Sequence, residues 1–317
     1  MAEETDRPAL LGMPEGLKLS LEWLADAPLF ADDEQITALY DAVVRPETET
    51  GKITISLEKL RGESGKLHGK IQGEIGISSW IKKLLPFLDA KVGGEAGGEA
   101  SKEESEKRGQ TIELRPVTSP YRQLIQLTLH YAANHPGRMR IVLDPCKEGW
   151  YDEQFVEALP RSLVFLEIPR EAKLMPMAAE GDNGTVRPLH AELAKRLSEE
   201  VDGTPKYPSH RKFPDPALYQ QKQAEYWQWF AKNFSSQNAM AAVEEVVKDG
   251  GRLRWIDYRV PLDSSSNPLH LHVCGRGKFD TGVFAYNVIE RGHVHGLRIV
   301  GTLKSGPDLN VLAILDR

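Results

Sequence analysis

Residues 269–275 read LHLHVCG, and the strict alternation of apolar and polar side chains in this stretch decides how the C-terminal part of the chain is interpreted. In a β-strand, side chains at positions i and i+2 share a face, so His270, His272 and Cys274 point to one side and the apolar residues between them to the other. The stretch therefore predicts a half-buried strand with two histidines and a cysteine on its outer face.

Four further stretches near this strand also have strand character. They read RLRWIDYRV, GVFAYNVIE, HVHGLRIVGTL and LNVLAILD, at residues 252–260, 282–290, 293–303 and 309–316. Short connections such as GRGKFD and SGPD join them, and consecutive strands with tight connections are typical of an antiparallel sheet. We therefore predict a five-stranded antiparallel meander from residue 251 onward.

The rest of the chain mixes strand and helix patterns. Period-two alternation predicts strands at 17–23, 52–60 and 66–78, and apolar spacing with capping signals predicts helices at about 33–45, 187–201, 216–234 and 237–248. The predicted fold class is α+β, with a mixed N-terminal sheet and covering helices, a helical middle and the C-terminal antiparallel β-meander.

The expected domain organisation follows from these patterns. Residues 1–14 are expected to form a flexible tail, and residues 15–180 an N-terminal α/β region. Within that region, a mobile loop is predicted at about 93–110, which contains the motif GGEA twice and then a highly charged run. Residues 186–317 are expected to hold helices followed by the meander.

Composition limits the function classes. The formal net charge is -6 and the pI is about 5.9, so we expect no broad surface for nucleic acid. The chain has two cysteines, Cys146 and Cys274, which indicates no disulfide framework, and neither has flanking residues typical of a nucleophile. No signal peptide and no run of about 18 apolar residues is found, so a cytoplasmic protein is predicted.

The N-terminal third contains FADDEQITALYDAVV, then GKIQGEIGIS, then KVGGEAGGEA with a charged tail. This order resembles uncharacterised bacterial proteins with a Gly/Glu-alternating N-terminal segment. The resemblance implies no activity.

Two His-x-His pairs raise the question of a metal site. His270 and His272 share one strand face, and His293 and His295 share another. In a plain meander an intervening strand would hold the two pairs about 9–10 Å apart, too far for one zinc ion with bonds near 2.1 Å. We expect half-exposed strand histidines, and a zinc site at these four residues is the alternative.

A second candidate site is acidic. Asp144 ends one apolar strand, and Glu167 and the pair Glu171-x-Lys173 follow another. Two carboxylates and a lysine at neighbouring strand ends resemble a Mg²⁺-dependent nuclease or hydrolase site. Asp144-Pro145 also reads as a turn, and Pro169 interrupts the strand before Glu171.

Two further segments could contact partners. The expected amphipathic helix around residue 80 could rest on a membrane through Trp80, Lys82, Lys83 and Leu84, or it could cover the N-terminal sheet. An aromatic helix beside a basic loop could form a contact surface through four residues, Trp227, Trp229, Arg211 and Lys212.

The sequence contains no G-x-S-x-G, no dinucleotide-binding or kinase signature and no C-x-x-C. The first hypothesis is therefore a non-enzymatic cytosolic binding or sensor protein of a bacterial multi-component system, with another protein as partner and no cofactor. The alternatives are a metal-dependent hydrolase or nuclease using Zn or Mg, and a membrane-associating effector acting through residues 66–100.

Overall fold

The computed structural model describes the chain in separate stretches, which are 21–44, 53–56, 84, 90–93, 111–114, 117–135, 138–142, 162–170, 174–233, 235–250, 252–260, 269–275, 279–304 and 308–317. The expected tail at 1–14 and residues 94–110 of the expected loop lie outside these stretches. The chain forms two compact units. Unit 1 comprises residues 1–27 and 33–140, and unit 2 comprises residues 28–32 and 141–317.

Unit 1 combines helices with a small sheet. Its elements are η1 (Glu22–Ala25), α1 (Asp33–Val43), β2 (Ile53–Ser56), β3 (Ala90–Gly93), β4 (Thr111–Leu114) and α5 (Pro120–Asn134). The sheet is antiparallel with β4 in the middle. Helix α1 packs against α5, and the buried Tyr40 hydroxyl donates a 2.6 Å hydrogen bond to Gln126 Oε1 between them.

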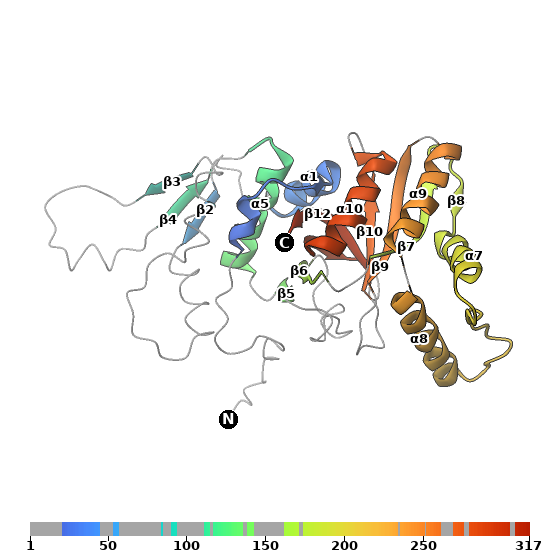
Figure 1. Ribbon diagram of the computed structural model, residues 1–317. Helices are drawn as coiled ribbons and strands as arrows, with labels where there is room; N and C mark the ends of the chain where they lie inside the picture. Colours follow the sequence, from blue (N-terminus) through green and yellow to red (C-terminus); the bar gives the residue numbers. More distant parts are fainter. Residues whose placement is uncertain are drawn as a thin grey trace, which may run out of the picture. The chain divides into compact units, whose positions relative to one another are not determined.

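Unit 2 contains the large mixed sheet and the helices around it (Figure 1). Its strands are β1 (Phe30–Ala31), β6 (Leu163–Ile168), β7 (Met175–Gly181), β8 (Val186–Arg187), β9 (Leu253–Val260), β10 (Leu269–Cys274), β11 (Leu297–Leu303) and β12 (Asp308–Asp316). The boundary between the units falls within β5 (Met139–Val142), which is also part of this sheet. Its helices are α7 (Leu189–Glu200), α8 (Pro216–Asn233), α9 (Ser236–Gly250) and α10 (Gly282–Val294).

The strand order is β5-β6-β11-β12-β10-β9-β7-β8, and β1 pairs with β12 beside this path. Strand β10 pairs with β9 in the antiparallel sense and with β12 in the parallel sense. The helices and the mixed sheet confirm the predicted α+β class.

The predicted meander is wrong in one respect, because residues 282–290 form most of α10 instead of a strand. The buried side chains in this segment are Phe284, Ala285, Val288 and Ile289, and this spacing belongs to one face of a helix. Thr281 caps the helix by accepting a hydrogen bond from the Phe284 backbone N–H. Helix α10 with β11 thus connects β10 to β12, which is why these two strands run parallel.

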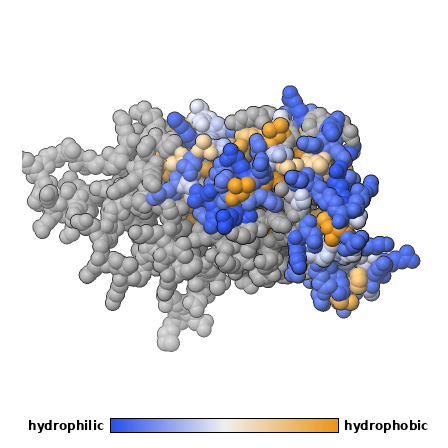
Figure 2. Space-filling model, viewed as in Figure 1, coloured by the Kyte–Doolittle hydropathy of each residue, from blue (hydrophilic) through white to orange (hydrophobic). Residues whose placement is uncertain are grey.

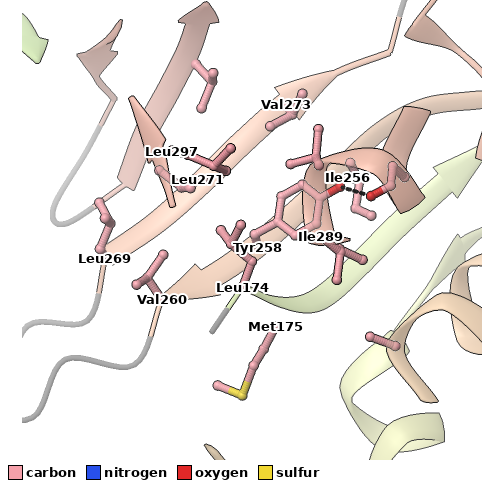
Figure 3. Packing of buried hydrophobic residues seen from close by; sticks show 14 of the residues in the cluster. Leu174, Met175, Ile256, Tyr258, Val260, Leu269, Leu271, Val273, Ile289 and Leu297 are labelled. Atoms are coloured by element: carbon pink, nitrogen blue, oxygen red, sulfur yellow. Dashed lines mark hydrogen bonds between the residues drawn. The ribbon is translucent and has the colours of Figure 1, made fainter. Parts of the chain in front are cut away.

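Strands β6 and β11 bury apolar side chains on both faces, among them Phe165 and Val300, whereas the hydrophobic core that β9 and β10 share lies on one face of the sheet. Every second residue of β10 is buried there, together with Tyr258 of β9 and Ile289 of α10 (Figure 3). The Tyr258 hydroxyl faces the Ala285 carbonyl oxygen at 3.5 Å, and burial raises the pKa of this phenol. Helices α9 and α10 cover this face (Figure 1), so the alternate side chains of β9 and β10 point away from them.

Five large hydrophobic side chains are exposed among the described residues, and they are Val186, Tyr207, Leu218, Val283 and Val294. On the face that Figure 2 shows, the described surface is mainly hydrophilic. On α10, the exposed valines Val283 and Val294 stand at opposite ends of the helix. Of the helices in the described stretches, none combines the length and apolar character that a membrane crossing requires.

Candidate ligand-binding face of the large sheet

The side of the sheet opposite the core gathers polar and ionisable side chains from three neighbouring strands. Pairing places His270 opposite Arg259, His272 opposite Asp257, and Cys274 opposite Trp255. On the other edge of β10, pairing with β12 adds two more polar groups. We call this half-buried group the polar face, and its members are Trp255, Asp257, Arg259, His270, His272, Cys274, Asp308 and Asn310.

The first chain of contacts on the polar face links Asp308, His270 and Arg259. His270 Nδ1 lies 3.0 Å from Asp308 Oδ1, and its Nε2 lies 3.4 Å from Arg259 Nη1. Since a guanidinium can only donate, Nε2 is the acceptor and Nδ1 carries the proton that Asp308 accepts. Burial and the adjacent Arg259 charge lower the pKa of His270, which agrees with a neutral imidazole at this position.

The second chain links Asp257, His272 and Cys274. His272 Nδ1 lies 2.6 Å from Asp257 Oδ1, and its Nε2 lies 3.6 Å from Cys274 Sγ. The hydrogen bond to Asp257 is the largest of the effects that raise the pKa of His272 to about 9. Two histidines only two residues apart on β10 thus differ in charge at neutral pH, with His272 protonated and His270 neutral.

Each end of the polar face is fixed by a neighbouring element. The Arg259 guanidinium lies over the Trp227 ring of α8, with Cζ 4.6 Å from the ring centroid. At the opposite end, the Trp255 indole N–H donates to Glu180 of β7, and Arg254 Nη1 lies 3.0 Å from the same carboxylate. The side chains of this face are therefore held in place by partners from separate strands and a helix.

The four histidines proposed for zinc do not gather in one place. His270 and His272 lie on the polar face, whereas His293 lies on α10, which covers the opposite face, and His295 is the exposed C-cap of that helix. Among the residues that the structure describes, no three His, Cys, Asp or Glu side chains form a group that could hold a metal ion.

The acidic candidates are described only in part. Asp144, Glu171 and Lys173 lie outside the described residues. Glu167 is paired with two arginines, since its oxygens lie 3.5 Å from Arg298 Nε and 3.4 Å from Arg317 Nε.

The membrane and aromatic candidates also have distinct environments. Leu84 is fully buried, and Trp80, Lys82 and Lys83 lie outside the described residues. Arg211 and Lys212 are exposed and lie in a turn that precedes α8. Within α8, Trp229 is half-buried, and Trp227 is buried against Tyr226, Phe230 and Arg259.

The sequence interpretation did not single out Asp257, Arg259, Asp308 and Asn310. A signal for the first two was present, because Trp255, Asp257 and Arg259 alternate with the apolar residues of RWIDYRV. Placing this strand beside LHLHVC as an antiparallel pair would have brought both sets to one face. No such signal existed for Asp308 and Asn310, whose position depends on the parallel pairing.

Comparison of the chain with protein-family models, curated proteins and solved structures found no significant match.

The contact between His272 and Asp257 makes a measurable pH prediction. In an NMR titration, His272 is expected to titrate near pH 9, and Asp257→Asn should move its pKa toward the ordinary 6.5 because the main hydrogen-bond acceptor for the imidazolium is weakened. Since the folded pKa lies above the unfolded one, this pair stabilises the fold fully below about pH 6.5, and its contribution is lost as the pH rises through about 9. A His272 pKa near 6.5 in the unmodified chain would contradict the assignment.

Proposed function

We propose that the protein is a binding or sensor protein whose ligand contacts the polar face of the large sheet. One observation carries this proposal: ionisable side chains from three strands are half-exposed together, and each is already fixed by a partner. Groups that are oriented before binding lose little conformational entropy when a ligand arrives, and such convergent polar groups give a site its specificity. A cytoplasmic location and a role in a bacterial multi-component system belong to the same proposal.

A thermal-shift screen of the full chain tests this function. The compounds should include neutral sugars, amino acids, carboxylic acids and phosphorylated metabolites. We expect at least one to raise the melting temperature of the unmodified chain, and this shift should shrink in His272→Gln and Asp308→Asn, because each change removes a group or its orienting partner. The matched control is His295→Gln, which changes an exposed histidine away from the polar face.

Two results would contradict the binding proposal. The first is a set of ligands whose effects are the same in all three variants. The second is turnover of nucleotides or nucleic acid upon addition of Mg²⁺ or Zn²⁺, which would favour the metal-dependent hydrolase instead.

A second candidate function is cysteine-dependent acyl transfer, which the chain of contacts Asp257–His272–Cys274 favours. A nucleophile near a histidine that a carboxylate orients is the arrangement used in covalent catalysis. In such a step Cys274 reacts as a thiolate: its sulfur forms a bond to the ester carbonyl carbon, the ester C–O bond breaks, and the His272 imidazolium gives a proton to the leaving oxygen.

The test uses p-nitrophenyl acetate with a Cys146→Ser chain, in which Cys274 is the remaining thiol. We expect release of up to one equivalent of nitrophenol and an acetyl group on the Cys274 peptide in mass spectra. His272→Asn should slow the acetylation by roughly 100-fold, which is the usual effect of removing a positioned acid or base. Equal acetylation rates in the Cys146→Ser chain with and without His272→Asn would exclude cysteine-dependent acyl transfer.

A further inference from the structure

We propose that Arg259, held between Trp227 and His270, binds the carboxylate or phosphate group of a small organic ligand. This inference rests on the proposed binding function and names the chemical class of the ligand. Within the described stretches, the Arg259 side chain makes one hydrogen bond, the 3.4 Å contact between Nη1 and His270 Nε2, and its buried Nε meets no acceptor there.

Arg259 differs in its ion pairing from two other arginines of the same sheet, which each contact a carboxylate. Arg254 is paired with Glu180 at 3.0 Å, and Arg298 is paired with Glu167 at 3.5 Å. No Asp or Glu of the described residues forms an ion pair with Arg259. The polar face therefore contains a half-buried cation with no anionic partner in the part of the chain that the structure describes.

The physical chemistry of the guanidinium explains why this favours an anion. Burial lowers the pKa of Arg259 to about 10, so the group remains protonated at neutral pH and bears part of the cost of lost hydration. An oxyanion restores that lost interaction. The Trp227 ring occupies a face of the guanidinium, whereas the N–H donors lie in its plane and match the two oxygens of a carboxylate or phosphate.

The surroundings of Arg259 also favour an organic ligand over an inorganic ion. The Tyr207 ring lies 5.9 Å from the Trp227 ring and is 44% exposed, and its hydroxyl accepts a 2.6 Å hydrogen bond from Gln223. An exposed aromatic ring held beside a cation offers a surface for the apolar part of a ligand whose charged end reaches Arg259.

Isothermal titration calorimetry of the full chain tests the inference, with sodium benzoate and phenyl phosphate as probes and neutral benzamide as the uncharged comparison. We expect at least one anion to bind more tightly than benzamide. Arg259→Gln should weaken its binding at least about tenfold, which corresponds to losing one charge-assisted hydrogen bond. The anion affinity of Arg259→Lys should lie between those of the unmodified chain and Arg259→Gln, since lysine keeps the charge but lacks the planar pair of donors.

Arg254→Gln is the matched control, because it removes a positive charge from the same strand while leaving Arg259 unchanged. Its anion affinity should equal that of the unmodified chain. Should the Arg259 variants fail to fold, NMR of the unmodified chain provides the same test. The imidazole signals of His270 should shift upon addition of the anion, and those of the exposed His295 should not.

The outcomes separate this inference from the proposed function. Anion binding that is unaffected by Arg259→Gln, or benzamide binding as tight as benzoate binding, would overturn the anion site. A ligand from the thermal-shift screen that is neutral and depends on His272 would also overturn it while leaving the binding function intact. Absence of any ligand in both experiments would overturn the two together.

Discussion

Replacing Gly296 with alanine is expected to lower the free energy of unfolding by about 2–5 kcal/mol. Gly296 has φ +81°, where an L-residue costs roughly 1–2 kcal/mol, and a Cβ there would lie only 2.4 Å from the Ile168 carbonyl oxygen. That oxygen belongs to β6, whose pairing with β11 starts next to Gly296, so the backbone can move away only at a further cost of about 1–3 kcal/mol. Urea unfolding of the full chain measures the change.

Gly203 provides a matched control for this prediction. Its φ of +80° is nearly the same, yet no atom lies within 4 Å of the position its Cβ would take. Gly203→Ala should therefore show only the backbone cost of roughly 1–2 kcal/mol. Equal losses in the two variants would mean that the close approach to β6 has no energetic consequence.

Leu271→Ala is expected to cost about 2–5 kcal/mol of unfolding free energy. Leu271 is 1% exposed in β10, between β9 and β12 and beneath the helices of the core (Figure 3). Removing its side chain deletes buried apolar contacts and leaves a cavity, which the paired strands on both sides cannot readily close. Chemical denaturation monitored by circular dichroism gives the value.

The comparison for Leu271 is Val294→Ala on α10, where the side chain is 55% exposed. Its effect should stay within about 0.5 kcal/mol, as for most surface changes. A Leu271→Ala loss as small as that of Val294→Ala would show that the core is not packed at this strand as described.

The alternation in LHLHVCG was sufficient to predict β10 and which of its residues are buried, and RLRWIDYRV was sufficient to predict the strand β9. Apolar spacing likewise predicted α7, α8 and α9 with ends close to those observed. These predictions were reliable because each element has one buried side and its period is therefore visible in the sequence.

The strand predicted at residues 282–290 was wrong for a physical reason, and this error also changed which residues were expected beside His270. Val283, Ala285, Asn287 and Ile289 can be taken as a strand pattern, and short apolar segments do not separate the two periods. Thr281 as an N-cap and Gly296 after the helix were the signals for α10. The predicted antiparallel order would have set His293 two strands from His270, whereas the parallel pairing places Asp308 beside it.

Strand β12 also has a consequence for how the chain reaches its folded state. One edge of β12 pairs with β10 at residues 308–310 and then with β1, which contributes Phe30 and Ala31 to unit 2. A strand from near the start of the sequence therefore joins a strand near its end, and such long loops are slow to close. We expect the β1–β12 pairing to form late during refolding. A chain whose backbone is cut between β1 and β6 would then leave part of the β12 edge unpaired and open to association with other chains.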